Sequence, residues 1–413
     1  MKKLFKILFI LAIFFVVYVY VLNITMMPKC ITLLQGEKLE LATLWGLKLK
    51  QNSKSSTNIE SYDQEKTLET SGGIGDETQV AGRIDLSLNL FNAIDLTNIT
   101  VNVIPKTKVI PLGNAIGLKL YTEGVLIVGL SEINGVKPYE NTGIKEGDRI
   151  VYINNKKILS TDDLVETVNS SHGKEVQVKY VKEENSEEKT VGMVPVKTND
   201  NEFKLGLWVR DAAAGVATAT FYEPDSGYFG SLGHGITDVD TGDLVTIANG
   251  ELVNSNIVSI KKGEKGTPGE IRGSIEGQSK IGDVYKNTAF GVFGKITSTA
   301  RLHVTEDEME VLSRNNIKTG KAQIICELEK GNKKYYNIEI EKIYANNNKD
   351  NKSMLIKVTD DELIEKTGGI IQGMSGSPII QNGKFVGAVT HVLVNDPTTG
   401  YGVFADMMLK EIK

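Results

Sequence analysis

The sequence has few cysteines, few prolines and no excess of positive charge. Its 413 residues include only two cysteines, Cys30 and Cys326, so we expect free thiols and neither a disulfide framework nor a zinc site. With 47 basic and 52 acidic residues, the net charge of −5 gives no support to nucleic-acid binding, which usually requires a basic stripe. Nine prolines accompany 41 glycines, which is typical of turn-rich β structure.

The N-terminus carries an apolar run after a basic start. Every residue from Ile7 to Leu22 is apolar or Tyr, and three lysines precede the run. Because no small-residue cleavage site follows, residues 1–28 are predicted to form a membrane anchor or signal segment that is not removed. Lysines favour the cytoplasmic side, so the rest of the chain is expected to be membrane-anchored outside the cytoplasm.

The remainder divides into a polar region and two predicted domains. Residues 29–105 are interpreted as a stalk and linker with a short strand region, since 51–83 are mostly polar and 86–104 alternate apolar with polar residues. A strand-rich segment with one helix follows at 106–198, and short strands separated by glycine turns fill 200–413. These patterns predict a mainly β protein with a C-terminal barrel or sandwich.

The 106–198 segment has the pattern of a peptide-binding domain. Residues 143–150 read Gly-Ile-Lys-Glu-Gly-Asp-Arg-Ile, and Ser160 is placed to cap the helix that follows. This combination resembles PDZ domains, which hold an extended peptide between a helix and a strand edge. The resemblance implies a carboxylate-binding loop formed by Ala115, Ile116, Gly117 and Leu118.

The sharpest signal is the stretch Gly-Met-Ser-Gly-Ser-Pro at residues 373–378. It is similar to the G-D-S-G-G-P motif of trypsin-like peptidases, whose fold is a double β-barrel. Ser375 is the candidate nucleophile, and the amides of Gly373 and Ser375 form the candidate oxyanion hole. Ser377 is the rival nucleophile. Met374 replaces the aspartate of the motif, which predicts that something other than an ion pair stabilises this loop.

A serine needs a base to become nucleophilic near neutral pH, and the chain has four histidines. His234, in a Gly-His-Gly turn after a predicted strand, is the candidate base, and His391 is the alternative. A third group should accept the other N–H of the imidazole. Its spacing from His234 makes Asp283 the acid that sequence geometry favours.

The whole chain resembles the stage IV sporulation protein B family, the sporulation signalling serine peptidases with a PDZ domain. The shared stretches include residues 230–236 (GSLGHGI), 262–270 (KGEKGTPGE) and 367–380 (TGGIIQGMSGSPII). The resemblance implies that the acid is Asp360, fifteen positions before Ser375, so Asp360 and Asp283 stand as alternatives. No metal or cofactor motif appears in the sequence, and a triad peptidase needs neither, so we expect none.

The resemblance also implies a function. Members of this family act in the forespore intermembrane space, where they cleave themselves and a regulator of an intramembrane metalloprotease. This cleavage activates processing of the late mother-cell sigma factor. The expected partners are that protein substrate, the chain itself, a peptide ligand of the PDZ domain and the membrane. Two other hypotheses are a catalytically idle PDZ scaffold and a general extracytoplasmic quality-control protease.

Overall fold

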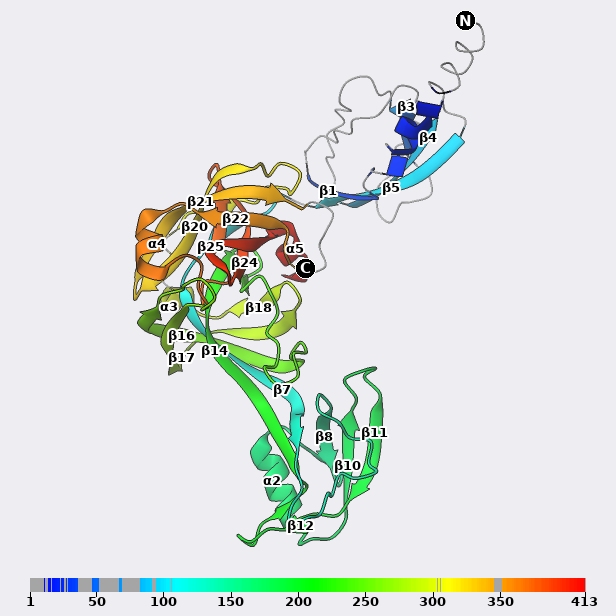
Figure 1. The fold of residues 1–413 in the computed structure, drawn as a ribbon, viewed down its shortest axis with the longest axis vertical. Coiled ribbons are helices and arrows are strands. Elements are labelled where there is room, and N and C mark those ends of the chain that lie inside the picture. The colour runs from blue at the N-terminus through cyan, green and yellow to red at the C-terminus, as the bar shows by residue number, and fades with distance from the viewer. Residues whose placement is uncertain are drawn as a thin grey trace, which may run out of the picture. The chain divides into compact units, whose positions relative to one another are not determined.

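A computed structural model describes most of the chain after residue 105 and shorter pieces before it (Figure 1). The described residues are 11, 14–15, 17–22, 24–25, 27, 29–35, 47–51, 67–68, 82–90, 94–104, 106–302, 304, 306–344 and 351–412. The chain divides into two compact units. The first consists of residues 1–107 with 313–317, and the second consists of residues 108–312 with 318–413.

The first unit contains a five-stranded sheet in the order β1-β5-β4-β2-β3. Its strands are β1 (Cys30–Leu34), β2 (Leu47–Gln51), β3 (Thr67–Leu68), β4 (Gly82–Leu90) and β5 (Ile94–Ile104). Alternate apolar side chains point to one face, where Leu88, Ile99 and Val101 have no exposed surface. The structure therefore contains a folded sheet where the sequence predicted a stalk with a short strand region.

Residues 1–28, the predicted anchor, are described only in part. Residues 11, 14–15, 17–22 and 24–25 are helical. No helix in the described residues combines the length and the apolar character that crossing a membrane requires.

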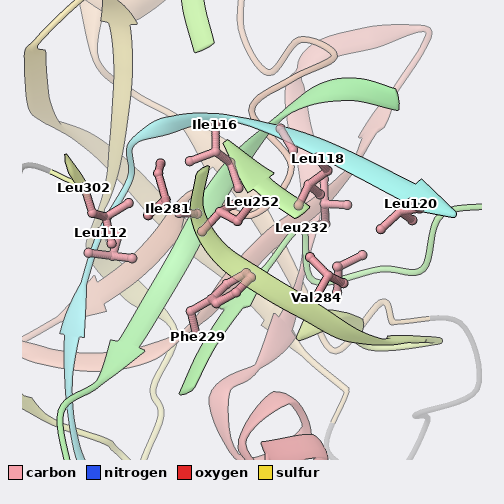
Figure 2. Packing of buried hydrophobic residues seen from close by; sticks show 13 residues of the cluster. Leu112, Ile116, Leu118, Leu120, Phe229, Leu232, Leu252, Ile281, Val284 and Leu302 are labelled. Atoms are coloured by element: carbon pink, nitrogen blue, oxygen red, sulfur yellow. The ribbon is translucent and has the colours of Figure 1, made fainter. Parts of the chain in front are cut away.

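The second unit contains a first six-stranded barrel. Its strands follow the order β7 (Ala115–Leu130), β16 (Ile247–Lys261), β17 (Glu270–Thr288), β18 (Gly291–Ile296), β15 (Tyr228–Ser231) and β14 (Leu207–Glu223). The barrel closes because β14 also pairs with β7. Every second side chain points inward, so Leu118, Phe229 and Leu252 meet in a buried apolar core (Figure 2). Short elements beside it are β6 (Lys108–Pro111), α3 (Thr299–Leu302) and β19 (Met309–Glu310).

A PDZ-like segment is inserted into this barrel between β7 and β14. Both strands continue out of the barrel side by side and enter a second core (Figure 1). Ser160 caps α2 as predicted, since its hydroxyl accepts the amide of Asp163, and Leu164 and Val168 pack into that core. The remaining elements are β8 (Arg149–Ile153), β9 (Lys156–Lys157), α2 (Thr161–Ser170), β10 (Val176–Val181), β11 (Glu188–Met193), β12 (Val196–Lys197) and β13 (Phe203–Lys204).

The C-terminal part of the second unit is another closed barrel. Its strands follow the order β20 (Gly320–Glu329), β21 (Asn332–Ile343), β22 (Met354–Val358), β25 (Asp396–Phe404), β24 (Lys384–Leu393) and β23 (Pro378–Gln381). Three helices accompany it: α4 (Asp361–Thr367), α5 (Ala405–Leu409) and the 3₁₀ helix η1 (Lys410–Ile412). Cys326 on β20 is a free, buried thiol, as predicted.

The two closed barrels confirm the prediction of a mainly β protein with a double-barrel domain. The predicted boundary between 106–198 and 200–413 differs from the structure, because the first half of β7 belongs to the barrel although it precedes the PDZ-like segment. Gly124, with φ of +81°, lies where β7 passes from one core to the other. A continuous strand pattern gives no sign that its two halves serve different cores.

Candidate active site

Ser375 lies in a tight turn between two glycines in the left-handed conformation. Gly373 has φ of +96° and Gly376 has φ of +97°, which glycine adopts without steric cost. A Cβ on Gly376 would lie 2.4 Å from the carbonyl oxygen of Thr218 and 2.6 Å from the amide nitrogen of Leu232. The turn therefore requires glycine here, because the first barrel lies directly against it.

Of the two serines in the motif, Ser375 is the one with an accessible hydroxyl. Its side chain is partly exposed and donates to the carbonyl oxygen of Thr390 at 2.7 Å. Ser377 has no exposed surface, and its Oγ has no hydrogen-bond partner. The structure therefore favours Ser375 over its rival as the nucleophile.

The amides of Gly373 and Ser375 donate no hydrogen bond within the described part of the chain, whereas those of Met374 and Gly376 are both paired. Unpaired backbone N–H groups are rare inside folded proteins. Two such groups beside a partly exposed serine are suited to bind developing negative charge. These are the two amides that the sequence predicts for an oxyanion hole.

Residues 262–271, which we call the strap, hold the Ser375 loop in place. The Gly263 amide donates to the carbonyl of Thr367 at 2.8 Å. Gln372 donates to the carbonyl of Gly269 at 3.0 Å and accepts from the amide of Ile271 at 2.8 Å. The strap thus pairs with the backbone immediately before Gly373. In the sequence, residues 262–270 were identified only as a stretch shared with the family. Their pairing with the backbone of the Ser375 loop could not be predicted from it.

Met374 takes the place of the motif's aspartate and is completely buried. A methionine offers no charge, so burial of its apolar surface anchors the loop instead of an ion pair. The strap adds backbone hydrogen bonds to this anchor. The sequence predicted that something other than an ion pair stabilises this loop, and these two features fill that role.

His234 lies in the turn that follows β15, and its ring is held by the backbone of the next residue. Nδ1 lies 2.9 Å from the carbonyl oxygen of Gly235. A carbonyl only accepts, so Nδ1 carries the proton and Nε2 keeps its lone pair in the neutral ring. Burial lowers the pKa of His234 below its usual 6.5, and the bond to Gly235 opposes this only in part. The ring is therefore a neutral base near pH 7.

The turn that carries His234 is fastened by two polar anchors. The Asn287 side chain accepts from the amide of Ile236 at 2.9 Å and donates to its carbonyl at 2.8 Å. Asp238 is buried, accepts two backbone amides and forms an ion pair with Arg210. Burial would raise the pKa of Asp238, but these amides and the guanidinium lower it below its usual value, so the carboxylate stays ionised.

The His234 turn and the Ser375 loop lie against each other. A Cβ on Gly233 would lie 3.0 Å from Cγ2 of Thr390, whose carbonyl holds the Ser375 hydroxyl. His391 follows Thr390 on β24, and its ring centroid lies 5.3 Å from that of His234. No hydrogen bond within the described residues joins Ser375 to His234. Ser375 must therefore rotate away from Thr390 before it can meet the base.

The structure brings neither candidate acid to His234. Asp360 is the N-cap of α4, where one carboxylate oxygen accepts the amide of Leu363 at 3.2 Å and the other accepts the amide of Asn337 at 3.1 Å. Asp283 lies on β17 and pairs with Lys280 at 2.6 Å. Both carboxylates have other partners in this structure, and the resting His234 is oriented by Gly235.

A cavity of about 660 Å³ opens beside the two imidazoles. Its wall is mostly apolar, with Ala213, Val216 and Ile236 next to His234 and His391. A further polar side chain of the wall is Asn351, which is 7% exposed. Sequence reasoning missed Asn351, because nothing distinguishes one asparagine in an Asn-rich stretch.

The predicted carboxylate-binding loop is not a loop. Ala115, Ile116, Gly117 and Leu118 lie within β7, and Ile116 and Leu118 are core residues of the first barrel. The strand edge beside α2 belongs instead to β14, where the Asp211 carboxylate accepts the amide of Thr161 at 2.7 Å. The error arose because the same apolar-Gly-Leu pattern occurs twice, at 116–118 and at 205–207.

Two family models match the chain, one at residues 101–193 and the other at residues 201–409. The model of the SpoIVB peptidase S55 family matches residues 201–409, which is just over half of the chain. The chain belongs to the SpoIVB peptidase S55 family. A PDZ model matches residues 101–193 of this S55 peptidase. The S55 chain is thus a serine peptidase that carries a PDZ domain, and its resemblance to the sporulation family is confirmed.

Solved structures similar to this S55 peptidase include one of each domain type. The PDZ domain of the SdrC-like protein (Lmo2051) from Listeria monocytogenes is 15% identical and covers 21% of this chain and 87% of its own, with a TM-score of 0.18. The active form of the Rv3671c protease from M. tuberculosis is 15% identical and covers 48% of this chain and 73% of its own, with a TM-score of 0.29. No curated protein matches the chain.

Proposed function

We propose that this S55 peptidase uses Ser375 as its nucleophile and His234 as its base. The observation that carries the proposal is the pair of unpaired amides at Gly373 and Ser375, beside a hydroxyl and a neutral imidazole. Unpaired amides at this position stabilise negative charge that develops next to Ser375, as it does when a serine attacks a peptide carbonyl.

Peptide hydrolysis at this site proceeds through an acyl ester on Ser375. The Ser375 Oγ forms a bond to the peptide carbonyl carbon while its proton passes to Nε2 of His234. The carbonyl oxygen becomes an oxyanion, held by the amides of Gly373 and Ser375. His234 then gives the proton to the leaving amine as the C–N bond breaks, and water hydrolyses the acyl ester by the same two steps.

Asp360 is the acid that the family resemblance implies, and its role needs a test of its own because its carboxylate caps α4 in this structure. A triad carboxylate fixes the tautomer of the base, and its replacement by an amide lowers kcat by about 10⁴-fold. An N-cap tolerates Asp→Asn, because asparagine caps helices as well as aspartate does. We expect Asp360→Asn to separate the two roles. A large loss of cleavage identifies the triad acid, whereas near-normal cleavage assigns Asp360 to capping α4.

We propose that the PDZ domain takes an extended peptide along β14 at residues 207–211. In the described residues this part of β14 pairs with β7 alone, and α2 flanks its other side. A strand edge beside a helix accepts a peptide by adding it as a further strand. The open edge of β14 therefore replaces residues 115–118 as the predicted docking site.

We further propose that the chain cleaves itself and a regulator of an intramembrane metalloprotease during sporulation. It would do so outside the cytoplasm, in the forespore intermembrane space, anchored by the apolar run from Ile7 to Leu22. Membership of the S55 family and the presence of a PDZ domain support this role.

The test compares the purified full chain with its Ser375→Ala and His234→Ala variants. We expect new N-termini to appear in wild type and in the control Ser377→Ala, because the Ser377 hydroxyl is buried and unpaired. Neither active-site variant should produce them. Cleavage that persists in Ser375→Ala would refute the assignment, and peptide binding with no cleavage in any form would identify a scaffold. Broad digestion of casein would identify a quality-control protease.

A further inference from the structure

We propose that Asn351 is a positioning residue for the His234 imidazole, with its Oδ1 as the acceptor that holds the ring during catalysis. The inference rests on the proposed function of Ser375 and His234, and it takes Asp360 as the N-cap of α4 rather than as the triad acid, so a large loss of cleavage in Asp360→Asn would overturn it. It concerns a residue that neither the serine motif nor the histidine turn contains.

The orientation of the Asn351 side chain is fixed by its neighbours. Its Nδ2 donates to the carbonyl oxygen of Ala289, and only the nitrogen end of the amide can make that bond. Its own backbone carbonyl accepts Oγ1 of Thr390 at 3.1 Å. The carbonyl of Thr390 accepts the Ser375 hydroxyl. Asn351 is therefore hydrogen-bonded to the residue of β24 that holds the nucleophile.

The oxygen end of the same amide has no partner. Asn351 is 7% exposed, and its Oδ1 is buried without a hydrogen bond. A buried polar atom in this condition is uncommon and calls for an explanation such as a catalytic role. The side chain lines the same cavity as His234 and His391, and the rest of that wall is mostly apolar.

The reaction creates a need for such an acceptor. In the resting structure Nδ1 of His234 donates to Gly235, while Ser375 donates to Thr390. When the ring moves to receive the Ser375 proton on Nε2, its Nδ1–H leaves Gly235 and needs another acceptor. Asp360 and Asp283 have other partners, whereas Oδ1 of Asn351 has none within the described residues, and the Asn351 side chain belongs to the wall of the cavity that His234 also lines.

A neutral amide acceptor has a consequence that a carboxylate would not have. It orients the ring without adding negative charge, so the pKa of His234 stays low, in line with the burial of the ring. A carboxylate at the same position would favour the imidazolium and raise that pKa. The identity of residue 351 therefore sets the pH at which the base becomes protonated.

The experiment measures the rate at which a fluorophosphonate probe labels Ser375 in the full chain between pH 5 and 9. For Asn351→Leu, which removes the acceptor at similar volume, we expect labelling to slow by about 100-fold. For Asn351→Asp we expect labelling to persist, with its acid limb moved to higher pH by about one unit. Asn395→Ala, in an exposed turn, serves as the control and should match wild type.

Two results would overturn the inference while leaving the peptidase assignment intact. One is an Asn351→Leu variant that is labelled as fast as wild type, and the other is an Asn351→Asp variant with an unmoved acid limb. If Asn351→Leu does not fold, the acid limb of Asn351→Asp decides, with Asn351→Ala as the second truncation. A wild-type chain that is never labelled at Ser375 would instead refute the proposed function itself.

Discussion

In the resting structure, the Ser375 hydroxyl is held by an acceptor that takes no part in the reaction. It donates to Thr390, whereas attack requires that it donate to His234. The sequence predicted Ser375, His234 and the two oxyanion amides, because each lies in a short motif whose local geometry glycine dictates. Asn351 and the free edge of β14 could not be predicted, because each depends on contacts between segments distant in sequence.

The pH dependence of the reaction follows from the state of His234. We expect the labelling rate of Ser375 to decrease below a midpoint that lies under pH 6.5, because burial lowers the pKa of His234 and only the neutral ring accepts a proton. The unfolded chain binds this proton more readily than the folded one, so stability also decreases as pH falls below about 6.5. A midpoint at or above 6.5 would contradict a desolvated base.

Gly376 provides a test of how closely the serine turn approaches the first barrel. We expect Gly376→Ala to lower the free energy of unfolding by about 3 kcal/mol, since a Cβ would add a backbone clash at 2.4 Å to the strain of positive φ. Gly383 has φ of +71° with nothing within 4 Å, so Gly383→Ala should cost only about 1 kcal/mol. Urea denaturation measures both. Equal effects would show that the approach is not close.

Among the elements, the strap has the most direct effect on the oxyanion hole. A Cβ on Gly269 would lie 2.5 Å from both the Gly263 amide nitrogen and Cγ2 of Ile371, whereas one on Gly266 would meet nothing. We therefore expect Gly269→Ala to displace the loop and slow labelling of Ser375 at least tenfold, with Gly266→Ala close to wild type. Peptide binding to the PDZ domain is the second readout and should not change. Equal labelling of the two variants would contradict a role for the strap.

At the scale of the whole molecule, β7 and β14 join the PDZ core to the first barrel. The sequence predicted the fold class and both domain types, because strand alternation and the two motifs are local signals. It did not reveal that β7 and β14 serve both cores, or where the peptide edge lies, because two halves of one strand can enter different cores without any change of pattern.

The shared strands make a prediction about unfolding. Because β7 and β14 contribute to both cores, we expect their amides at 115–122 and 124–130, and at 207–212 and 213–223, to exchange with one common free energy of opening. Hydrogen exchange in increasing urea measures these values. A PDZ half that opens at much lower urea than the barrel half would show that the two cores are independent.

The central claim concerns the meeting of Ser375, His234 and the two free amides, and the structure of a covalent phosphonate adduct tests it most directly. We predict phosphorus bonded to Oγ of Ser375, one phosphonyl oxygen within hydrogen-bonding distance of the amides of Gly373 and Ser375, and Nε2 of His234 facing Oγ. An adduct on another residue, or one in which His391 rather than His234 faces Oγ, would contradict the account.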